Sequence, residues 1–271
     1  GQVPAPSIEM VTIPAGVFEM GPGPLPVTNG IEPNPAHKVS LDTYEIGKYP
    51  VTNEQYLAFV QDTGYRYPIT WTEGYPEGRA RHPVAGLTWI DARLFARWMS
   101  QKTGEPWHLP TEAQWEKAAR WHPEAERSRD YPWGDSADES RANVGPNVAG
   151  TTTAVDAYSP EGDSYYGVAD MAGNIAEWTN SGLGGYPYTA TDGRESLGSV
   201  SRRAIRGSDY YSILVPVRDR PLPSESWVHL WGLRVARSTA LDTAADRFVE
   251  SVRTYLDSYN QALHEEYARR G

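Results

Sequence analysis

Glycine and proline interrupt this chain so often that long helices and strands have little room in it. The sequence contains 25 Gly and 22 Pro, residues that end or bend regular elements. It also carries 10 Trp and 17 Tyr, with 39% hydrophobic residues overall, which is enough apolar surface for one sizeable core. We find no fixed-period repeat. We therefore expect a loop-rich α+β fold in which short elements surround a single core.

The charge and the absent residue types exclude several classes of protein. The formal net charge is −10, which argues against a nucleic-acid partner because such a partner requires a basic face. No run approaches the about 20 apolar residues of a membrane span, and no signal peptide is recognisable, which favours the cytoplasm. The absence of cysteine rules out disulfides and thiol nucleophiles and leaves the redox compartment open. The opening Gly1-Gln2 is typical of a piece cut from a longer chain.

Three helices are predicted from apolar spacing and from their start signals. The first covers 54–61, with Thr52 as its N-cap, and the second covers 88–103. The third begins after Thr111, and Gln114 three residues on completes a capping box. These local patterns predict where each helix begins.

The strands are predicted from alternation and from turn residues. Residues 10–20 alternate around a Pro-Ala-Gly turn and predict a β-hairpin, and 37–46 predict a further strand. Residues 204–206 and 233–236 predict closing strands late in the chain. The stretch 131–187 shows little periodicity, so no helix is expected there.

The last part of the chain carries a stripe of apolar and small residues whose spacing alternates between four and three. This heptad-like pattern predicts an amphipathic helix of roughly thirty residues. Two roles stay open for it, docking on its own domain and self-association. The stripe consists of Leu241, Ala245, Phe248, Val252, Tyr255, Tyr259 and Ala262. We accordingly expect two parts, a domain over 1–238 and a C-terminal helix over 239–271.

Eight short motifs follow one another along residues 10–237. They are IPAGVFEMG (13–21), YPVTNEQY (49–56), HPVAGLTWIDA (82–92), HLPTEAQWEKAAR (108–120), YPWGD (131–135), YGVADMAGNIAEWT (166–179), RGS (206–208) and GLRVA (232–236). In this set and order the chain resembles the formylglycine-generating-enzyme/sulfatase-modifying-factor family. The resemblance implies a C-type-lectin-like domain with limited regular secondary structure and bound calcium.

The same resemblance implies residues for two structural calcium sites. The first site would use the side chains of Asn143 and Asp156 with the backbone carbonyls of Val144 and Tyr158. The second site would use Gly173, Asn174, Ile175 and Glu177. Calcium takes about six to eight hard oxygen ligands, which carboxylate, amide and carbonyl groups in a loop can supply together. The alternative is that these polar residues only cap turns.

Members of the family that make formylglycine use two cysteines after an RGGS motif to bind copper and activate oxygen. In this chain Ser212 and Val217 stand at those positions. Neither is a soft ligand, so no copper is expected and that reaction is excluded. The related sulfoxide synthases of ergothioneine biosynthesis hold iron with histidines, but the six histidines here form no paired cluster. We therefore expect a protein that is not an enzyme.

The segment 209–231 departs most from the family pattern although family motifs flank it. It is rich in aromatic residues and arginine, which is the composition of binding hot spots. We interpret it as a surface that recognises a protein or another macromolecular ligand from a rigid scaffold. The alternative is that many of its apolar residues belong to the core. The expected ligand-binding residues are Asp209, Tyr210, Tyr211, Ser212, Ile213, Leu214, Arg218, Arg220, Ser224, Ser226, Trp227, His229 and Trp231.

The segment also resembles the variable region of proteins that retroelements diversify. Such proteins carry their mutated residues in this part of a C-type lectin domain, and adenine-directed mutation of Asn codons omits Trp, Met, Lys, Glu and Gln. Within 209–231 only Glu225, Trp227 and Trp231 lie outside the permitted set. The leading hypothesis is a ligand-binding protein with a variable surface. The alternatives are an enzyme or enzyme subunit with non-cysteine chemistry, and a sensor or regulatory module of a larger protein.

Overall fold

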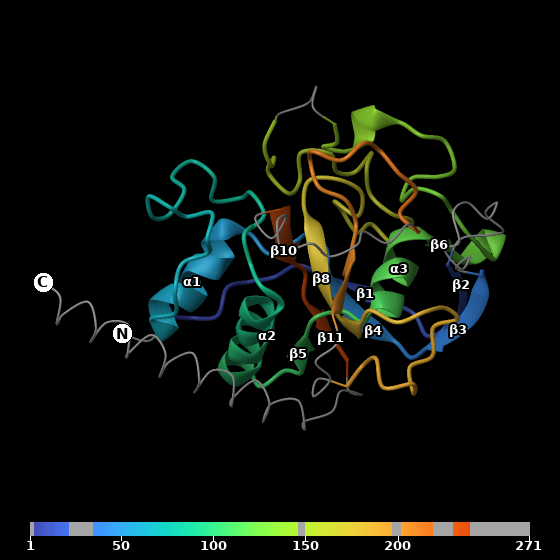
Figure 1. Cartoon of the computed structure of the whole chain (residues 1–271), viewed down its shortest axis with the longest axis horizontal. Coiled ribbons are helices and arrows are strands. Elements are labelled where there is room, and N and C mark those ends of the chain that lie inside the picture. The colour runs from blue at the N-terminus through green and yellow to red at the C-terminus, as the bar shows by residue number, and fades with distance from the viewer. Residues whose placement is uncertain (1–2, 22–34, 146–149, 197–201, 219–229, 239–271) are drawn as a thin grey trace, which may run out of the picture.

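The computed structural model describes five stretches of the chain (Figure 1). They are residues 3–21, 35–145, 150–196, 202–218 and 230–238. The predicted tail helix over 239–271 lies outside the described residues, so its two possible roles stay predictions. Within the described stretches, no helix combines the length and the apolar character that crossing a bilayer requires.

The three α-helices form where their local signals predicted them. They are α1 (Asn53–Thr63), α2 (Trp89–Thr103) and α3 (Glu112–Arg120). Each helix begins after a threonine whose hydroxyl accepts a hydrogen bond from the third helical amide, and each capping box is complete. The helices α1 and α2 end at Gly64 and Gly104, whose positive φ values of 68° and 77° favour glycine. The predicted helix starts are confirmed.

A four-stranded antiparallel sheet joins the two ends of the domain. Its strands are β1 (Met10–Ile13), β4 (Tyr44–Gly47), β11 (Ala236–Arg237) and β5 (Trp107–His108). The strand order is β1-β4-β11-β5, so a late strand lies between an early strand and a central one (Figure 1). Pairing between segments that lie so far apart in sequence closes the domain on itself.

The hairpin expected over residues 10–20 is wrong. Two strands do form there, but β1 pairs with β4, and the second strand, β2, pairs with β3. The bounds of β2 and β3 are Gly16–Met20 and His37–Leu41. The Lys117 ammonium of α3 donates hydrogen bonds to the carbonyls of Pro14 and Gly16, at 2.6 and 3.1 Å. These contacts with α3 hold the connection between β1 and β2 so that each strand faces a different partner. The single strand expected over 37–46 is likewise divided into β3 and β4.

A second sheet holds the strands on either side of the divergent segment. Its strands are β8 (Ala176–Gly182), β9 (Arg203–Arg206) and β10 (Trp231–Leu233), in the order β10-β8-β9. Strand β9 runs antiparallel to β8 and β10 runs parallel to it. The chain therefore leaves one edge of β8 after β9 and returns to the other edge at β10. The closing strand predicted over 204–206 is confirmed as β9, whereas the single strand predicted over 233–236 is divided between β10 and β11, with Arg234 and Val235 outside both.

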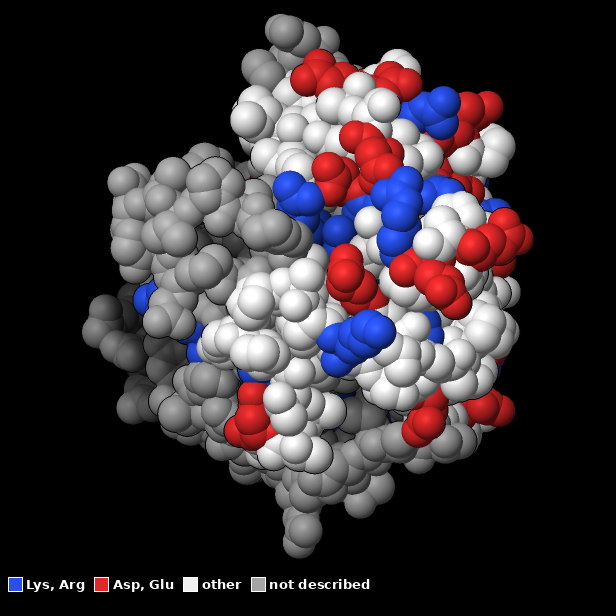
Figure 2. Space-filling view, turned by 90° about the vertical axis from the view of Figure 1, so that its right-hand side faces the viewer, with Lys and Arg blue, Asp and Glu red and all other residues white. Residues whose placement is uncertain are grey.

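The remaining elements are short. They are β6 (Trp121–His122), β7 (Arg127–Ser128), and the 3₁₀ turns η1 (Pro123–Ala125) and η2 (Glu139–Arg141). As predicted, the described part of 131–187 contains no α-helix; η2 and β8 are its regular elements. Its polar loops, together with the other surfaces on the right of Figure 1, present acidic and basic side chains side by side (Figure 2).

A buried ion pair ties the sheets to α3. The guanidinium of Arg234 donates to the carboxylate of Glu177 at 2.8 Å, and neither side chain has any exposed surface. Trp115 of α3 donates its indole N–H to the same carboxylate at 2.7 Å. Arg234 also donates to the carbonyls of Gly47 and Ala169, both at 2.8 Å. Its position directly after β10 thus lets one side chain connect both sheets with the loop before β8.

Candidate functional site

The loop that follows β9 places two large apolar side chains in solvent. Tyr211 is 55% exposed and Ile213 is 70% exposed, the two highest values among the large hydrophobic side chains of the described residues. The turn that presents them is local. The Asp209 carboxylate accepts from the backbone N–H groups of Tyr211 and Ser212, at 2.8 and 3.0 Å, as an Asx turn does. The N–H of Gly145 donates to the Ser212 carbonyl at 2.8 Å and holds the turn on the domain.

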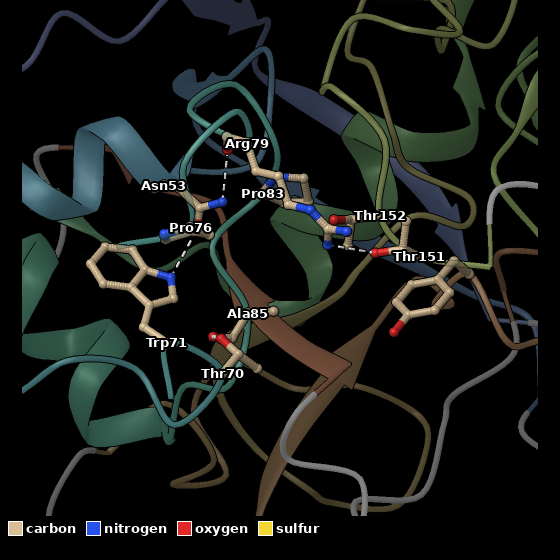
Figure 3. Close-up of a pocket in the computed structure, with 10 residues that line it drawn as sticks. Asn53, Thr70, Trp71, Pro76, Arg79, Pro83, Ala85, Thr151 and Thr152 are labelled. Atoms are coloured by element: carbon tan, nitrogen blue, oxygen red, sulfur yellow. Dashed lines mark hydrogen bonds between the residues drawn. The ribbon is translucent and has the colours of Figure 1, made fainter. Parts of the chain in front are cut away.

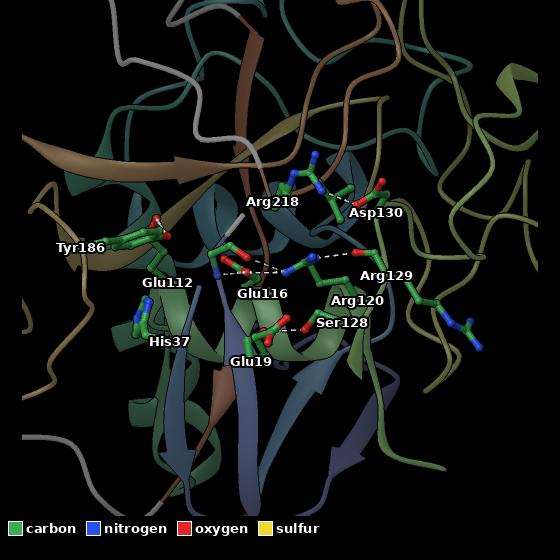
Figure 4. A network of polar contacts seen from close by, with 12 residues as sticks. Glu19, His37, Glu112, Glu116, Arg120, Ser128, Arg129, Asp130, Tyr186 and Arg218 are labelled. Atoms are coloured by element: carbon green, nitrogen blue, oxygen red, sulfur yellow. Dashed lines mark hydrogen bonds and ion pairs between the residues drawn. The ribbon is translucent and has the colours of Figure 1, made fainter. Parts of the chain in front are cut away.

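The far end of the loop is held by buried charge. Arg206 of β9 donates to the carbonyl of Val217 at 2.9 Å and to that of Arg218 at 3.3 Å. The backbone N–H of Val217 donates to the Asp130 carbonyl at 2.9 Å, and the Arg218 side chain pairs with the Asp130 carboxylate (Figure 4). Val217 is buried, and Leu214 packs against the same apolar cluster. The loop is therefore fixed at both ends while its tip is exposed.

The carboxylates that hold Arg206 lie on α3. Glu116 accepts from Arg120 at 2.9 Å (Figure 4). Glu116 also accepts from Arg206 at 2.8 Å, and Glu112 lies 3.5 Å from Arg206. All four side chains have 3% or less of their surface exposed. Charges buried this deeply are tolerated because each one is paired and hydrogen-bonded. This network serves the scaffold, since it positions β9 and the loop that leaves it.

A pocket of about 120 Å³ opens beside the start of the same loop (Figure 3). It is lined by Asn53, Thr70, Trp71, Pro76, Arg79, Pro83, Ala85, Thr151, Thr152 and Tyr210. These residues come from the start of α1, the segment before α2, the stretch after η2, and the loop after β9. The ring of Tyr210 lies 4.7 Å from that of Tyr211, centroid to centroid, so the pocket and the exposed tip of the loop are neighbours.

The ligand-binding residues expected from the sequence fall into three groups. Asp209 to Leu214 and Arg218 lie in the loop described above, where Leu214 faces the core and Arg218 pairs with Asp130. Trp231 lies in the core, 7% exposed and packed edge-on against Trp178 because β10 pairs with β8 there. The ligand surface therefore does not include Trp231. The expected residues Arg220, Ser224, Ser226, Trp227 and His229 lie outside the described residues.

The two positions that resemble the family's cysteines are not equivalent. The Ser212 hydroxyl donates to the Asp209 carboxylate at 3.2 Å, at the partly exposed turn. Val217 is 4% exposed and belongs to the core.

Sequence reasoning missed the wall of the pocket, because its residues come from separate stretches. The run Arg79-Ala80-Arg81-His82, a basic cluster in an acidic chain, was the one available signal.

The residues of the first predicted calcium site contain an oxygen without a partner. Asn143 has no exposed surface; its amide nitrogen donates to the Thr151 carbonyl at 2.8 Å, but its Oδ1 receives no hydrogen bond. A buried oxygen of this kind fits a cation ligand. Asp156, the carboxylate of the same set, pairs with Arg81. The carbonyl of Tyr158 accepts from the N–H of Gly162 at 2.7 Å.

The second predicted calcium set is already occupied by protein contacts. Both oxygens of Glu177 accept hydrogen bonds, from Arg234 and Trp115. The Asn174 amide bonds to Asn143, Thr153 and Asp170. A cation at Glu177 would have to replace the ion pair with Arg234. Among the described residues, no three acidic or histidine side chains gather as a metal cluster. The orphaned Asn143 oxygen therefore makes the first set the better fit.

Comparisons with known proteins agree with this architecture. The sequence model of the sulfatase-modifying factor enzyme 1-like domain matches residues 2–239. The solved structure of PvdO from Pseudomonas aeruginosa superposes with a TM-score of 0.62 at 24% identity, covering 84% of this chain and 94% of that one. Treponema denticola variable protein 1 superposes with a TM-score of 0.59 at 21% identity, again covering 84% and 94%. Both likenesses show the fold, and the expected loop-rich α+β fold of the formylglycine-generating-enzyme type is confirmed.

A further relative corrects the expectation that the chain is not an enzyme. A hercynine oxygenase of Mycolicibacterium thermoresistibile is 34% identical over 212 residues, which are 65% of this chain and 46% of that protein. The chain therefore spans about half the length of the hercynine oxygenases that it is similar to. Because such relatives are named for an enzymatic activity, the non-enzyme expectation, which rested on the absent cysteines and on the lack of a paired histidine cluster, is wrong. The family model covers nearly all of the described residues, and the chain belongs to the family of the sulfatase-modifying factor enzyme 1-like domain.

Proposed function

We propose that this domain binds its ligand on the surface formed by the loop 209–218 and the neighbouring pocket. One observation carries the proposal. Of the six large hydrophobic side chains that are exposed in the described residues, four lie on two of the segments that line the pocket. Tyr67 and Ile69 precede Thr70 and Trp71, and Tyr211 and Ile213 follow Tyr210. Exposed apolar groups concentrated around a pocket are characteristic of interaction sites.

The position of this surface in the fold supports the same role. By resemblance, it includes the stretch in which formylglycine-forming members carry their cysteines, and the stretch that variable proteins diversify. The likeness to Treponema denticola variable protein 1 supports a scaffold suited to such use.

We further propose that the loop has been diversified by a retroelement. Sequencing the DNA beside the gene for a near-copy of codons 206–237 tests this. A copy that differs almost only at adenines, next to a reverse transcriptase, supports it, and the absence of any copy contradicts it.

Selection from a library of random displayed peptides tests the binding surface itself. Peptides selected on the wild-type chain should bind a Tyr211→Ala, Ile213→Ala double variant about tenfold or more weakly, because both apolar contacts are removed. Val17→Ala with Tyr165→Ala is the matched control, since these two side chains are also exposed but come from β2 and the loop before β8. Peptides that bind both double variants equally well would contradict the proposed surface.

A second candidate function is oxygenase activity, which the hercynine oxygenase relatives favour. In this case the same surface would bind the substrate, and the rest of a longer protein would complete the site. The test is a calorimetric titration of hercynine into the chain, together with hercynine-dependent oxygen consumption by the full-length gene product. Hercynine binding that the Tyr211→Ala, Ile213→Ala variant loses supports this function. The absence of both binding heat and hercynine-dependent oxygen consumption in the full-length protein would overturn it.

We also propose that a structural calcium ion binds at Asn143 with the first predicted set, Asp156 and the carbonyls of Val144 and Tyr158. The partnerless Asn143 oxygen supports this site. Calcium that binds only the folded state should raise the melting temperature, and chelation with EDTA should lower it. Asn143→Ala should remove this dependence, while magnesium serves as the control ion because it prefers a tighter geometry. A melting temperature that calcium and EDTA leave unchanged contradicts the site.

A further inference from the structure

We propose that the pocket beside Tyr210 binds an organic carboxylate and that the Arg79 guanidinium is its anion-binding group. This inference rests on the proposed ligand-binding role and names the chemistry of the ligand. The ligand would place its carboxylate against Arg79 and Thr151, and a flat apolar group between Trp71 and Tyr210.

The charge around Arg79 supports an anion. Arginines nearby in the sequence are neutralised, since Arg66 pairs with Asp91 and Arg81 with Asp156. The side chain of Arg79 instead donates one hydrogen bond, to the hydroxyl of Thr151 at 2.8 Å (Figure 3), and forms no ion pair with a described carboxylate. A guanidinium has five N–H donors in a fork that matches a carboxylate, so donors remain for a ligand.

The composition of the pocket makes the same point. None of the ten lining residues is acidic, although the chain contains 35 Asp and Glu residues. A carboxylate that enters the pocket therefore meets one positive charge and no lining negative charge. The ring of His82 bonds at 3.0 Å to the hydroxyl of Thr152, which is one of the lining residues.

The backbone that carries Arg79 is held in place before any ligand arrives. Its carbonyl accepts from the Asn53 side chain at 2.8 Å and from the His82 N–H at 3.0 Å. The first amides of α1 are also used, since Asn53 N–H donates to the His82 carbonyl and Glu54 N–H to the Ala80 carbonyl. The helix end therefore offers the ligand no donors of its own here, and the guanidinium is the group left to bind an anion. A preformed site loses less conformational entropy on binding.

The same pocket also has apolar lining residues. The indole N–H of Trp71 donates to the Asn53 side chain at 3.2 Å, so its polar atom is already satisfied. Trp71 is 5% exposed, so it can offer a ligand only the small part of its ring that lines the pocket. Pro76, Pro83 and Tyr210 add further carbon surface to the same pocket. Flat apolar groups pack favourably on such aromatic and proline surfaces.

Two sources could supply a carboxylate of this kind, a small organic acid and the free C-terminus of a peptide that lies across the loop. N-acetylphenylalanine and its uncharged amide are matched probes for the first source. A short peptide that ends in phenylalanine, with a free or an amidated C-terminus, probes the second. Binding of each probe is measured by calorimetry to the whole chain. If N-acetylphenylalanine binds, a small organic acid is a sufficient ligand. If only the peptide with the free C-terminus binds, the ligand is a peptide C-terminus.

For either source, the free acid should bind wild type about tenfold or more tightly than the amide. Arg79→Gln should remove that preference, and Arg81→Gln, which changes a neighbouring arginine outside the pocket lining, should retain it. Equal binding of acid and amide, or a preference that survives Arg79→Gln, overturns the inference. Binding of inorganic phosphate while neither carboxylate probe binds also overturns it, because the site would then prefer another oxyanion.

The outcomes separate this inference from the proposed function. Peptides that depend on Tyr211 and Ile213 but ignore the charge of their C-terminus leave the ligand surface standing and remove the carboxylate site. Acid-selective binding that is lost in Arg79→Gln and unaffected by the Tyr211→Ala, Ile213→Ala variant supports the carboxylate site and shows that the loop tip is not part of the ligand surface. Thermal unfolding of each variant verifies that it is folded.

Discussion

The Glu177–Arg234 ion pair and the loop after β9 differ in how they depend on side chains. Glu177 and Arg234 have no exposed surface, and every contact of the pair uses a specific charged group. The loop is held through its backbone carbonyl and amide groups, together with the Asp209 carboxylate and the Arg218–Asp130 pair. The carbonyls of Ser212 and Val217 accept from Gly145 and Arg206, and the N–H of Val217 donates to Asp130.

This difference shows how one domain can combine an interior that tolerates few substitutions with a surface loop that tolerates many. A loop that is fixed by its own carbonyl and amide groups keeps its path when exposed side chains such as Tyr211 and Ile213 change. Removing the Arg206 side chain, by contrast, would free the far end of the loop, because this residue of β9 donates hydrogen bonds to two carbonyls there. Binding side chains can therefore vary at the loop tip while the scaffold residues around them stay the same.

The strongest test of the contrast is Arg234→Ala. This change leaves the Glu177 carboxylate buried without its cation, and we expect it to lower the free energy of unfolding by about 3–5 kcal/mol. Urea denaturation followed by tryptophan fluorescence measures the loss. Arg127→Ala is the control, because the Arg127–Asp135 pair is about half exposed and should contribute about 1 kcal/mol or less. A loss no larger than that of the control would show that the buried pair is not essential to the interior.

A smaller effect is expected from pH through His108. Burial lowers the pKa of His108 to about 4, below its usual value of 6.5. In the unfolded chain the ring takes up a proton at a higher pH than in the folded chain. Stability should therefore be greatest above pH 6.5 and fall by up to about 3 kcal/mol as the pH drops towards 4. His108→Gln should flatten this part of the curve, measured by urea denaturation across the pH range. An unchanged slope in the variant would assign the pH dependence to other groups.

The loop tip should have less effect on stability than either buried site. We expect the Tyr211→Ala, Ile213→Ala variant to change the free energy of unfolding by less than about 1 kcal/mol, chiefly through the lost Tyr210–Tyr211 ring contact. Leu214→Ala, in the same loop but packed on the core, should cost about 1–3 kcal/mol. The prediction is wrong if the Tyr211→Ala, Ile213→Ala variant lowers the free energy of unfolding as much as Leu214→Ala does. In that case the tip is part of the scaffold.

The smallest effect concerns the pocket wall. Burial lowers the pKa of His82, and the nearby positive charge of Arg79 lowers it further. Arg79→Gln removes the second cause, so the pKa of His82 should rise towards its ordinary value and stay below it. An NMR titration of the His82 ring protons measures the change. Arg81→Gln is the control, and a pKa that Arg79→Gln leaves unchanged would mean that solvent screens the guanidinium from the ring.

Local signals explain which parts of the fold were predictable. The three helix starts depend on Thr52, Thr88 and Thr111 and on residues three positions later, so neighbouring residues contain the whole signal. The hairpin over residues 10–20 failed because strand pairing depends on partners far away, here β4 and β3. The candidate site divides in the same way. The loop residues 209–214 were predicted, whereas Trp71, Arg79 and Thr151 were not, because only folding brings them together.

By itself, the sequence determined the helix caps, the order of the family motifs and the absence of thiol chemistry, since each is a property of residue types and short spacings. Only the tertiary structure decided which strands pair, which aromatic residues are buried and where a pocket forms. Trp231 and Tyr211 illustrate this, because both are aromatic residues of one divergent segment. One is buried against Trp178 and the other is exposed beside a pocket. The physical reason is that burial depends on contacts between distant segments, and residue type alone does not define those contacts.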